Sequence, residues 1–151
     1  MASTLVKINV HLVFHVKSTG ITMRDEDLCR VFSYIGGIIR GMGGAPIQIG
    51  GMPDHVHILS SLPKTLSLAD FVRTIKADSS KWIKTLDDCY KYFAWQEGYG
   101  AFSVSPSLIQ NTISYIARQA DHHKKRTFIE EYKLFLDAYG IDYDERFAFK
   151  D

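Results

Sequence analysis

The segment that most restricts the fold of this chain is Pro53-Asp54-His55-Val56-His57-Ile58-Leu59, where two histidines alternate with aliphatic residues. The alternation predicts a buried strand with both imidazoles on one face, about 6.5–7 Å apart at their Cα atoms. Two ring nitrogens at that spacing can bind one metal ion at about 2.1 Å each, although the pair can also be structural, each ring making one hydrogen bond. A metal here would need a further ligand and would keep open positions for a substrate oxygen.

Hydrophobic spacing around this strand predicts the order strand, helix, strand, strand, helix, strand within one domain of 151 residues. Residues 5–16 alternate over a long first strand, and a helix runs from about residue 24 to the glycines at 41–44. Residues 46–51 form a short strand, and Ser67 is expected to cap the second long helix. The strand-like stretch 92–105 is interrupted by two glycines, which indicates a bend or an arm.

A further helix is predicted over about residues 107–124, with Ser107 and Gln110 as a capping box. Tyr115 and Gln119 lie four residues apart and therefore share one side of it, about a quarter turn from its apolar face. Taken alone, they would be a packing residue and a surface residue. Next to a histidine pair they offer a nucleophile and an amide oxygen as a further ligand.

The net charge of +1 is unevenly distributed: residues 1–126 carry 15 Lys and Arg against 10 Asp and Glu, whereas residues 127–151 carry 3 against 7. We therefore expect a basic body followed by a C-terminal helix and an acidic tail over about 127–151. A basic body is compatible with phosphate binding, although a solvated surface gives a similar pattern. The candidate DNA-binding cations lie on one helix face, Arg73, Lys76 and Lys84, and beyond the tyrosine, Arg118, Lys124, Lys125 and Arg126.

Composition excludes several classes of function. No apolar run is long enough to cross a membrane, and Cys29 and Cys89 fit no metal spacing, so we expect a cytoplasmic protein with reduced thiols and no membrane partner. No Gly-rich phosphate loop is present, so no nucleotide cofactor is expected. The adjacent pair His122-His123 diverges on a helix, and the pair at 11 and 15 lies in a strand pattern, so neither is expected to form a metal site.

The chain resembles the single-tyrosine HUH transposases of the insertion-sequence 200/605 group, including their repeat-associated relatives. The resemblance covers essentially the whole chain and keeps the family's order of motifs. These motifs are His11-Leu12-Val13-Phe14, Met52-Pro53-Asp54-His55-Val56-His57, the segment from Ile75-Lys76 to Trp82, the stretch from Trp95 to Ser105, Tyr115-Ile116-Ala117-Arg118-Gln119, and the run from His122 to Phe128.

This resemblance implies an α+β fold of the ferredoxin-like or RNA-recognition-motif-like type, with an antiparallel sheet, helices on one face and a catalytic C-terminal helix. It also implies that His55, His57 and Gln119 bind Mg²⁺ or Mn²⁺ and that Tyr115 is the nucleophile. The expected activity is nicking and rejoining of single-stranded DNA with hairpin ends through a 5′-phosphotyrosine. A homodimer is expected, with Tyr115 reaching the partner's histidines as one arrangement.

Two other functions remain to be weighed. Histidine-triad nucleotide hydrolases also use alternating histidines, but they need a third one where this chain has Leu59. A domesticated, non-mobile relative that only binds hairpin or repeat DNA would share the fold. Retention of the tyrosine, both histidines and the glutamine favours the enzyme.

Overall fold

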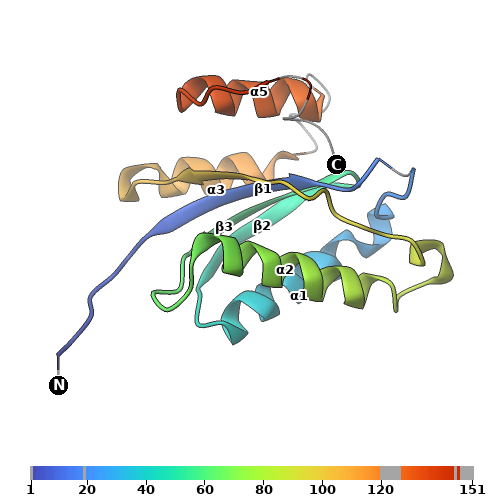
Figure 1. Cartoon of the computed structure of the whole chain (residues 1–151), viewed down its shortest axis with the longest axis horizontal. Coiled ribbons are helices and arrows are strands. Elements are labelled where there is room, and N and C mark those ends of the chain that lie inside the picture. The colour runs from blue at the N-terminus through green and yellow to red at the C-terminus, as the bar shows by residue number, and fades with distance from the viewer. Residues whose placement is uncertain (1, 19, 120–126, 145, 147–151) are drawn as a thin grey trace.

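The computed structural model describes residues 2–18, 20–119, 127–144 and 146, and its centre is a four-stranded antiparallel sheet (Figure 1). The sheet has the order β2-β3-β1-β4. The histidine strand β3 and its neighbour β1 are therefore the two central strands. The strands are β1 (Asn9–His15), β2 (Pro46–Met52), β3 (His55–Ser61) and β4 (Gly100–Ser103).

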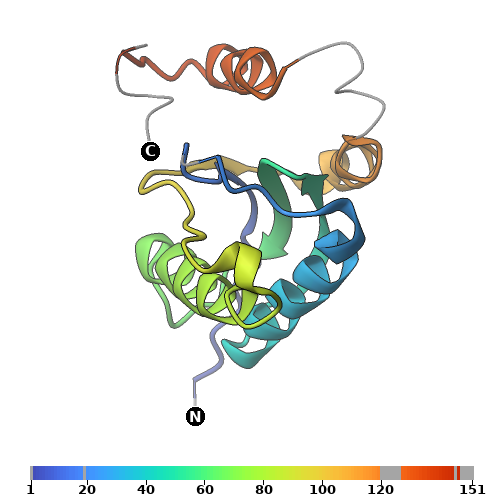
Figure 2. The same cartoon turned by 90° about the vertical axis from the view of Figure 1, so that its right-hand side faces the viewer.

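Helices cover both faces of the sheet (Figure 2). The helices α1 (Leu28–Gly41) and α2 (Leu68–Ile83) pack together below it, and α3 (Ile109–Ala117) and α5 (Phe128–Ala138) lie above it. Three short 3₁₀ turns complete the described elements: Asp25–Asp27, Asp88–Tyr90 and Pro106–Leu108. The predicted α+β architecture is confirmed, and none of the described helices is long and apolar enough to span a bilayer.

The two faces of β1 and β3 differ in chemistry. Val10, Leu12 and Phe14 point toward α1 and α2 and join the main core, and each buried apolar side chain of this size contributes about 1.5–3 kcal/mol. The alternate positions of the central strands carry Asn9, His11, His15, His55 and His57 toward α3 and α5. A polar surface inside the molecule is thus built by simple strand alternation.

The first strand is shorter than predicted. It begins at Asn9, which pairs with Ser61 at the last position of β3, so the ladder with β3 ends there. Before it, the alternating residues Leu5, Val6 and Ile8 are 91%, 47% and 50% exposed. Their pattern is typical of a strand, but no strand is paired with them within the described chain.

The two predicted helix caps had different outcomes. Ser67 caps α2, and its hydroxyl accepts a hydrogen bond from the Asp70 amide at 3.1 Å. The capping box at Ser107 is wrong, because Pro106 starts a 3₁₀ turn that includes Ser107, and α3 begins only at Ile109 without a side-chain cap. As described, α3 runs to Ala117, and the predicted end of this helix near residue 124 lies outside the described residues.

A glycine in β2 sets the position of α3. A Cβ atom on Gly50 would lie 2.8 Å from the carbonyl oxygen of Ile116, a distance that real Cβ atoms do not tolerate. Glycine therefore allows the backbone of α3 to rest directly on β2. This close contact brings Tyr115 over the histidine strand.

Candidate active site

Both histidines of β3 are fully buried, with 0% exposure, between the sheet and the upper helices. The Nδ1 atom of His55 lies 2.7 Å from Oδ1 of Asp54. Its Nε2 atom lies 3.0 Å from Oε1 of Gln119. The predicted third ligand, Gln119, is thus brought to the histidine strand, and its exposed fraction is only 2%.

The second histidine has a different pair of neighbours. Nδ1 of His57 is 2.8 Å from Nε2 of His11, and Nε2 of His57 is 2.7 Å from Oε1 of Glu131. Glu131 belongs to α5 and is 2% exposed. Each Nε2 atom of the histidine pair therefore faces one oxygen from another element.

This donor set fits a divalent cation. The nitrogens of the histidine pair and a Glu131 oxygen lie within 4.8 Å of one another. In octahedral coordination at about 2.1 Å, neighbouring ligand atoms lie about 3.0 Å apart, close to the 2.7 and 3.0 Å separations between each Nε2 and its oxygen. Imidazole, amide and carboxylate donors together suit Mg²⁺ or Mn²⁺.

Tyr115 lies against the same cluster. Its ring packs edge-on to His57, with centroids 5.8 Å apart, and to Phe135 of α5, with centroids 5.4 Å apart. Its hydroxyl lies close enough to the Glu131 carboxylate to help lower the pKa of that group. The tyrosine oxygen is therefore next to the position that a metal would occupy.

Electrostatics keep Glu131 ionised in this buried place. Burial alone raises the pKa of Glu131, but the adjacent His57 and Tyr115 side chains and the nearby His55 imidazole bring it below its ordinary value. Burial, reinforced by the charge that His57 can carry, lowers the pKa of His11 to about 3. A carboxylate thus stands beside a neutral ring, a charge balance that suits a cation.

Helix α5 closes the site from above. Phe128 packs on His55 with ring centroids 4.5 Å apart, and Phe135 contacts His11 at 5.1 Å. Together with Glu131 these side chains leave the histidine pair without solvent access. The site in this conformation is therefore closed.

The cations predicted to bind DNA are in several environments. Arg73, Lys84 and Arg118 are exposed, and Arg73 pairs with Asp70. Arg73 on α2 and Lys84 at its C-cap lie on the face of the sheet opposite the histidines, whereas Arg118 follows α3 near Gln119. Lys124 and Lys125, together with Arg126 and the pair His122-His123, lie outside the described residues.

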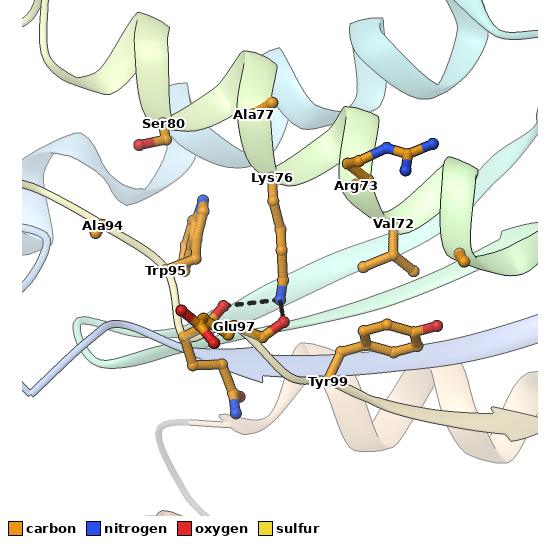
Figure 3. Close-up of a pocket in the computed structure, with 11 residues that line it drawn as sticks. Val72, Arg73, Lys76, Ala77, Ser80, Ala94, Trp95, Glu97 and Tyr99 are labelled. Atoms are coloured by element: carbon orange, nitrogen blue, oxygen red, sulfur yellow. Dashed lines mark hydrogen bonds between the residues drawn. The ribbon is translucent and has the colours of Figure 1, made fainter. Parts of the chain in front are cut away.

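Lys76 has a different setting from these exposed cations (Figure 3). Its ammonium donates to the carbonyls of Gln96, Glu97 and Gly98 at 2.8, 3.1 and 2.6 Å, and burial lowers the pKa of Lys76 to about 8. It therefore holds the glycine-containing segment that leads into β4. A DNA contact by Lys76 stays a prediction.

Lys76 lines a pocket of about 520 Å³ between α2 and residues 94–99. Arg73, Trp95 and Tyr99 also line it. None of the residues of the histidine cluster lines this pocket. Phe102 is 2% exposed and stacks on Phe135 in the core.

Two site residues were missed by sequence reasoning. Glu131 lies in the acidic C-terminal region, 74 positions after His57, and no local pattern distinguishes it from the neighbouring Glu130. His11 was considered only as half of a helical pair with His15. The signal that would have identified it is strand alternation, which places it opposite the apolar face of Leu12 and Phe14, where β3 presents its histidines.

The fold and the site define a class: an α+β protein that holds a tyrosine hydroxyl beside a buried histidine and carboxylate cluster able to bind a divalent ion. Residues 4–119 match the family described as Transposase IS200 like, and the chain belongs to this family. The match ends before α5, so Glu131 lies beyond it. No curated protein sequence matches the chain.

Two solved structures are similar in fold. One is a Deinococcus radiodurans R1 protein presumed to be a transposase, with a TM-score of 0.61 and 21% identity over 79% of this chain and 95% of that one. The other is a REP-associated tyrosine transposase bound to a REP hairpin, with a TM-score of 0.59 and 12% identity over 82% of this chain and 73% of that one. At these identities the likeness establishes the fold.

Proposed function

We propose that this transposase nicks and rejoins single-stranded DNA at hairpin ends, with Tyr115 as nucleophile and a divalent metal ion held by His55 and His57 with Glu131 and Gln119. The observation that carries the proposal is the convergence of these side chains from three elements on one buried point. The hairpin bound to the REP-associated relative supports the choice of substrate.

The chain's own residues suggest how the reaction proceeds. The Tyr115 oxygen forms a bond to the scissile phosphorus, the bond to the 3′ oxygen breaks, and the products are a 5′-phosphotyrosine and a free 3′-hydroxyl. The Tyr115 hydroxyl lies beside the Glu131 carboxylate, which can receive the phenol proton. A bound divalent ion would supply Lewis acidity at the phosphate oxygens. Attack by a second 3′-hydroxyl reverses the step, so no ATP is consumed.

Substrate entry requires a change in the position of α5. A phosphate cannot reach histidines that are 0% exposed, and the side chains that cover them from above belong to α5. In the proposed reaction α5 therefore shifts to admit the phosphate, with the Phe128 and Phe135 rings moving aside and Glu131 staying at the histidine pair. Arg73, Lys84 and Arg118, with Lys76, Lys124 and Lys125, are proposed to hold the DNA backbone.

The proposal is tested by incubating the protein with an end-labelled single-stranded DNA that carries a hairpin and flanking sequence. With Mn²⁺ or Mg²⁺ we expect cleavage and a covalent protein–DNA band on a denaturing gel, and neither in EDTA. Tight hairpin binding without any adduct or cleavage would instead identify a non-mobile DNA-binding relative.

The two oxygen ligands are expected to contribute unequally. Glu131→Gln should weaken Mn²⁺ binding by roughly 10-fold or more, because a buried carboxylate offsets the charge of the ion. Gln119→Ala should have a milder effect, since a water can replace one neutral ligand. Isothermal titration calorimetry measures both affinities, and a larger loss in the Gln119 variant would contradict this ranking.

Tyr115 lies beside the histidines of its own chain, which favours cleavage in cis over the trans arrangement considered from the sequence. The homodimer itself stays a prediction. Mixed Tyr115→Phe and His57→Ala proteins are expected to remain inactive after subunit exchange, because neither chain holds a complete site. Cleavage restored in the mixture would show delivery of the tyrosine across a dimer.

A further inference from the structure

His11 is buried in the site but belongs to neither the proposed ligands nor the nucleophile. It lies on β1, is 2% exposed, and its Nε2 atom is 2.8 Å from Nδ1 of His57. The two rings are tilted by 37° with centroids 5.1 Å apart. The contact is therefore a hydrogen bond between ring edges and not a stack.

The two histidines of β3 have matching surroundings. His55 directs Nε2 toward Gln119 and Nδ1 toward the Asp54 carboxylate, and His57 directs Nε2 toward Glu131 and Nδ1 toward His11. A neutral imidazole carries one N–H and one lone pair. If Nε2 of each ring binds a metal, Nδ1 must carry the proton and needs an acceptor, which Asp54 and His11 are placed to provide.

We propose that His11 is a positioning residue whose Nε2 lone pair accepts the Nδ1 proton of His57 and so fixes the tautomer in which Nε2 of His57 faces the metal. This role rests on the proposed metal site, because His11 would act on the metal only through its ligand His57.

The local environment explains why this acceptor is an imidazole. Asp54, the acceptor for His55, has a side chain 53% exposed, so its charge is solvated. His11 has no such access, and the rings of Phe102, Phe135 and Tyr115 surround it at centroid distances of 6.2, 5.1 and 6.4 Å. A second buried carboxylate beside Glu131 would be costly, whereas a neutral ring accepts the proton without adding charge.

The test compares acceptor-free and acceptor-bearing replacements of His11. His11→Leu and His11→Phe place an apolar side chain of similar size at this position and offer no hydrogen-bond acceptor. His11→Gln supplies an amide oxygen that can accept the Nδ1 proton of His57. Asn9→Leu is the matched control, because Asn9 is a buried polar residue on the same face of β1 and pairs with Ser61 away from the histidines. Thermal unfolding establishes that each variant is folded, and calorimetry measures Mn²⁺ affinity without DNA.

We expect the acceptor-free variants to bind Mn²⁺ about 10- to 100-fold more weakly than the wild type. His11→Gln should recover most of the affinity, and Asn9→Leu should leave it unchanged. Wild-type affinity in a folded acceptor-free variant would overturn the role of His11, as would equal losses in the Gln and Leu variants. A wild-type protein that binds no Mn²⁺ would overturn the metal site itself, which separates the two failures.

Discussion

Tyr115→Phe is expected to abolish the covalent protein–DNA adduct while leaving the fold and DNA binding intact. The ring keeps its contacts with His57 and Phe135. Only the hydroxyl and its polar interaction with Glu131 are lost, which should lower stability by about 0.5–1.5 kcal/mol. Removal of a nucleophile should reduce cleavage by roughly 10⁴-fold or more.

The measurement is a denaturing gel of labelled hairpin DNA, with DNA affinity followed separately by fluorescence anisotropy. Tyr99→Phe serves as the matched control, because Tyr99 is a half-buried tyrosine in the pocket beside Lys76. The control should form the adduct at the wild-type level. An adduct of full yield in Tyr115→Phe would assign the chemistry to another residue.

Replacing either metal histidine is expected to have the next largest effect. His55→Ala or His57→Ala should weaken Mn²⁺ binding by more than about 100-fold. Removing a ligand should reduce the affinity more than removing a residue that only orients a ligand. DNA cleavage should disappear with it. The double variant should show no measurable Mn²⁺ binding by calorimetry.

His15→Ala provides the control for these variants. His15 pairs with His55 across the sheet, its ring packs on Phe128, and its Nδ1 atom is 2.6 Å from the backbone carbonyl of Val16. We expect its Mn²⁺ affinity to match the wild type. Unchanged affinity in the double His55 and His57 variant would refute the metal assignment.

The parts of the fold that follow from local pattern were predictable. The alternation around His55 and His57 predicted a buried strand, and β3 is buried on both faces. The cap predicted at Ser67 is confirmed by its hydrogen bond from the Asp70 amide. Tyr115 and Gln119 were placed on one side of a helix by their four-residue spacing, and both meet the histidine strand. In each case the pattern that allowed the prediction spans only a few residues of the sequence.

The remaining features depend on contacts between distant elements. The first strand begins only at Asn9, because its ladder with β3 ends at Ser61. The alternation of residues 5–8 cannot reveal this limit. Glu131 enters the site because α5 folds back over the sheet, and its neighbour Glu130 remains exposed. His11 gains its place through a hydrogen bond across 46 positions of sequence.

The most direct test of the account is to locate the covalent bond. The wild-type protein is incubated with hairpin-bearing single-stranded DNA and Mn²⁺, digested with nuclease and protease, and analysed by tandem mass spectrometry. We expect a nucleotide attached through its 5′ phosphate to Tyr115 in the peptide that contains residues 115–118. A phosphate attached to a different residue, or cleaved DNA with no covalent peptide, would contradict it.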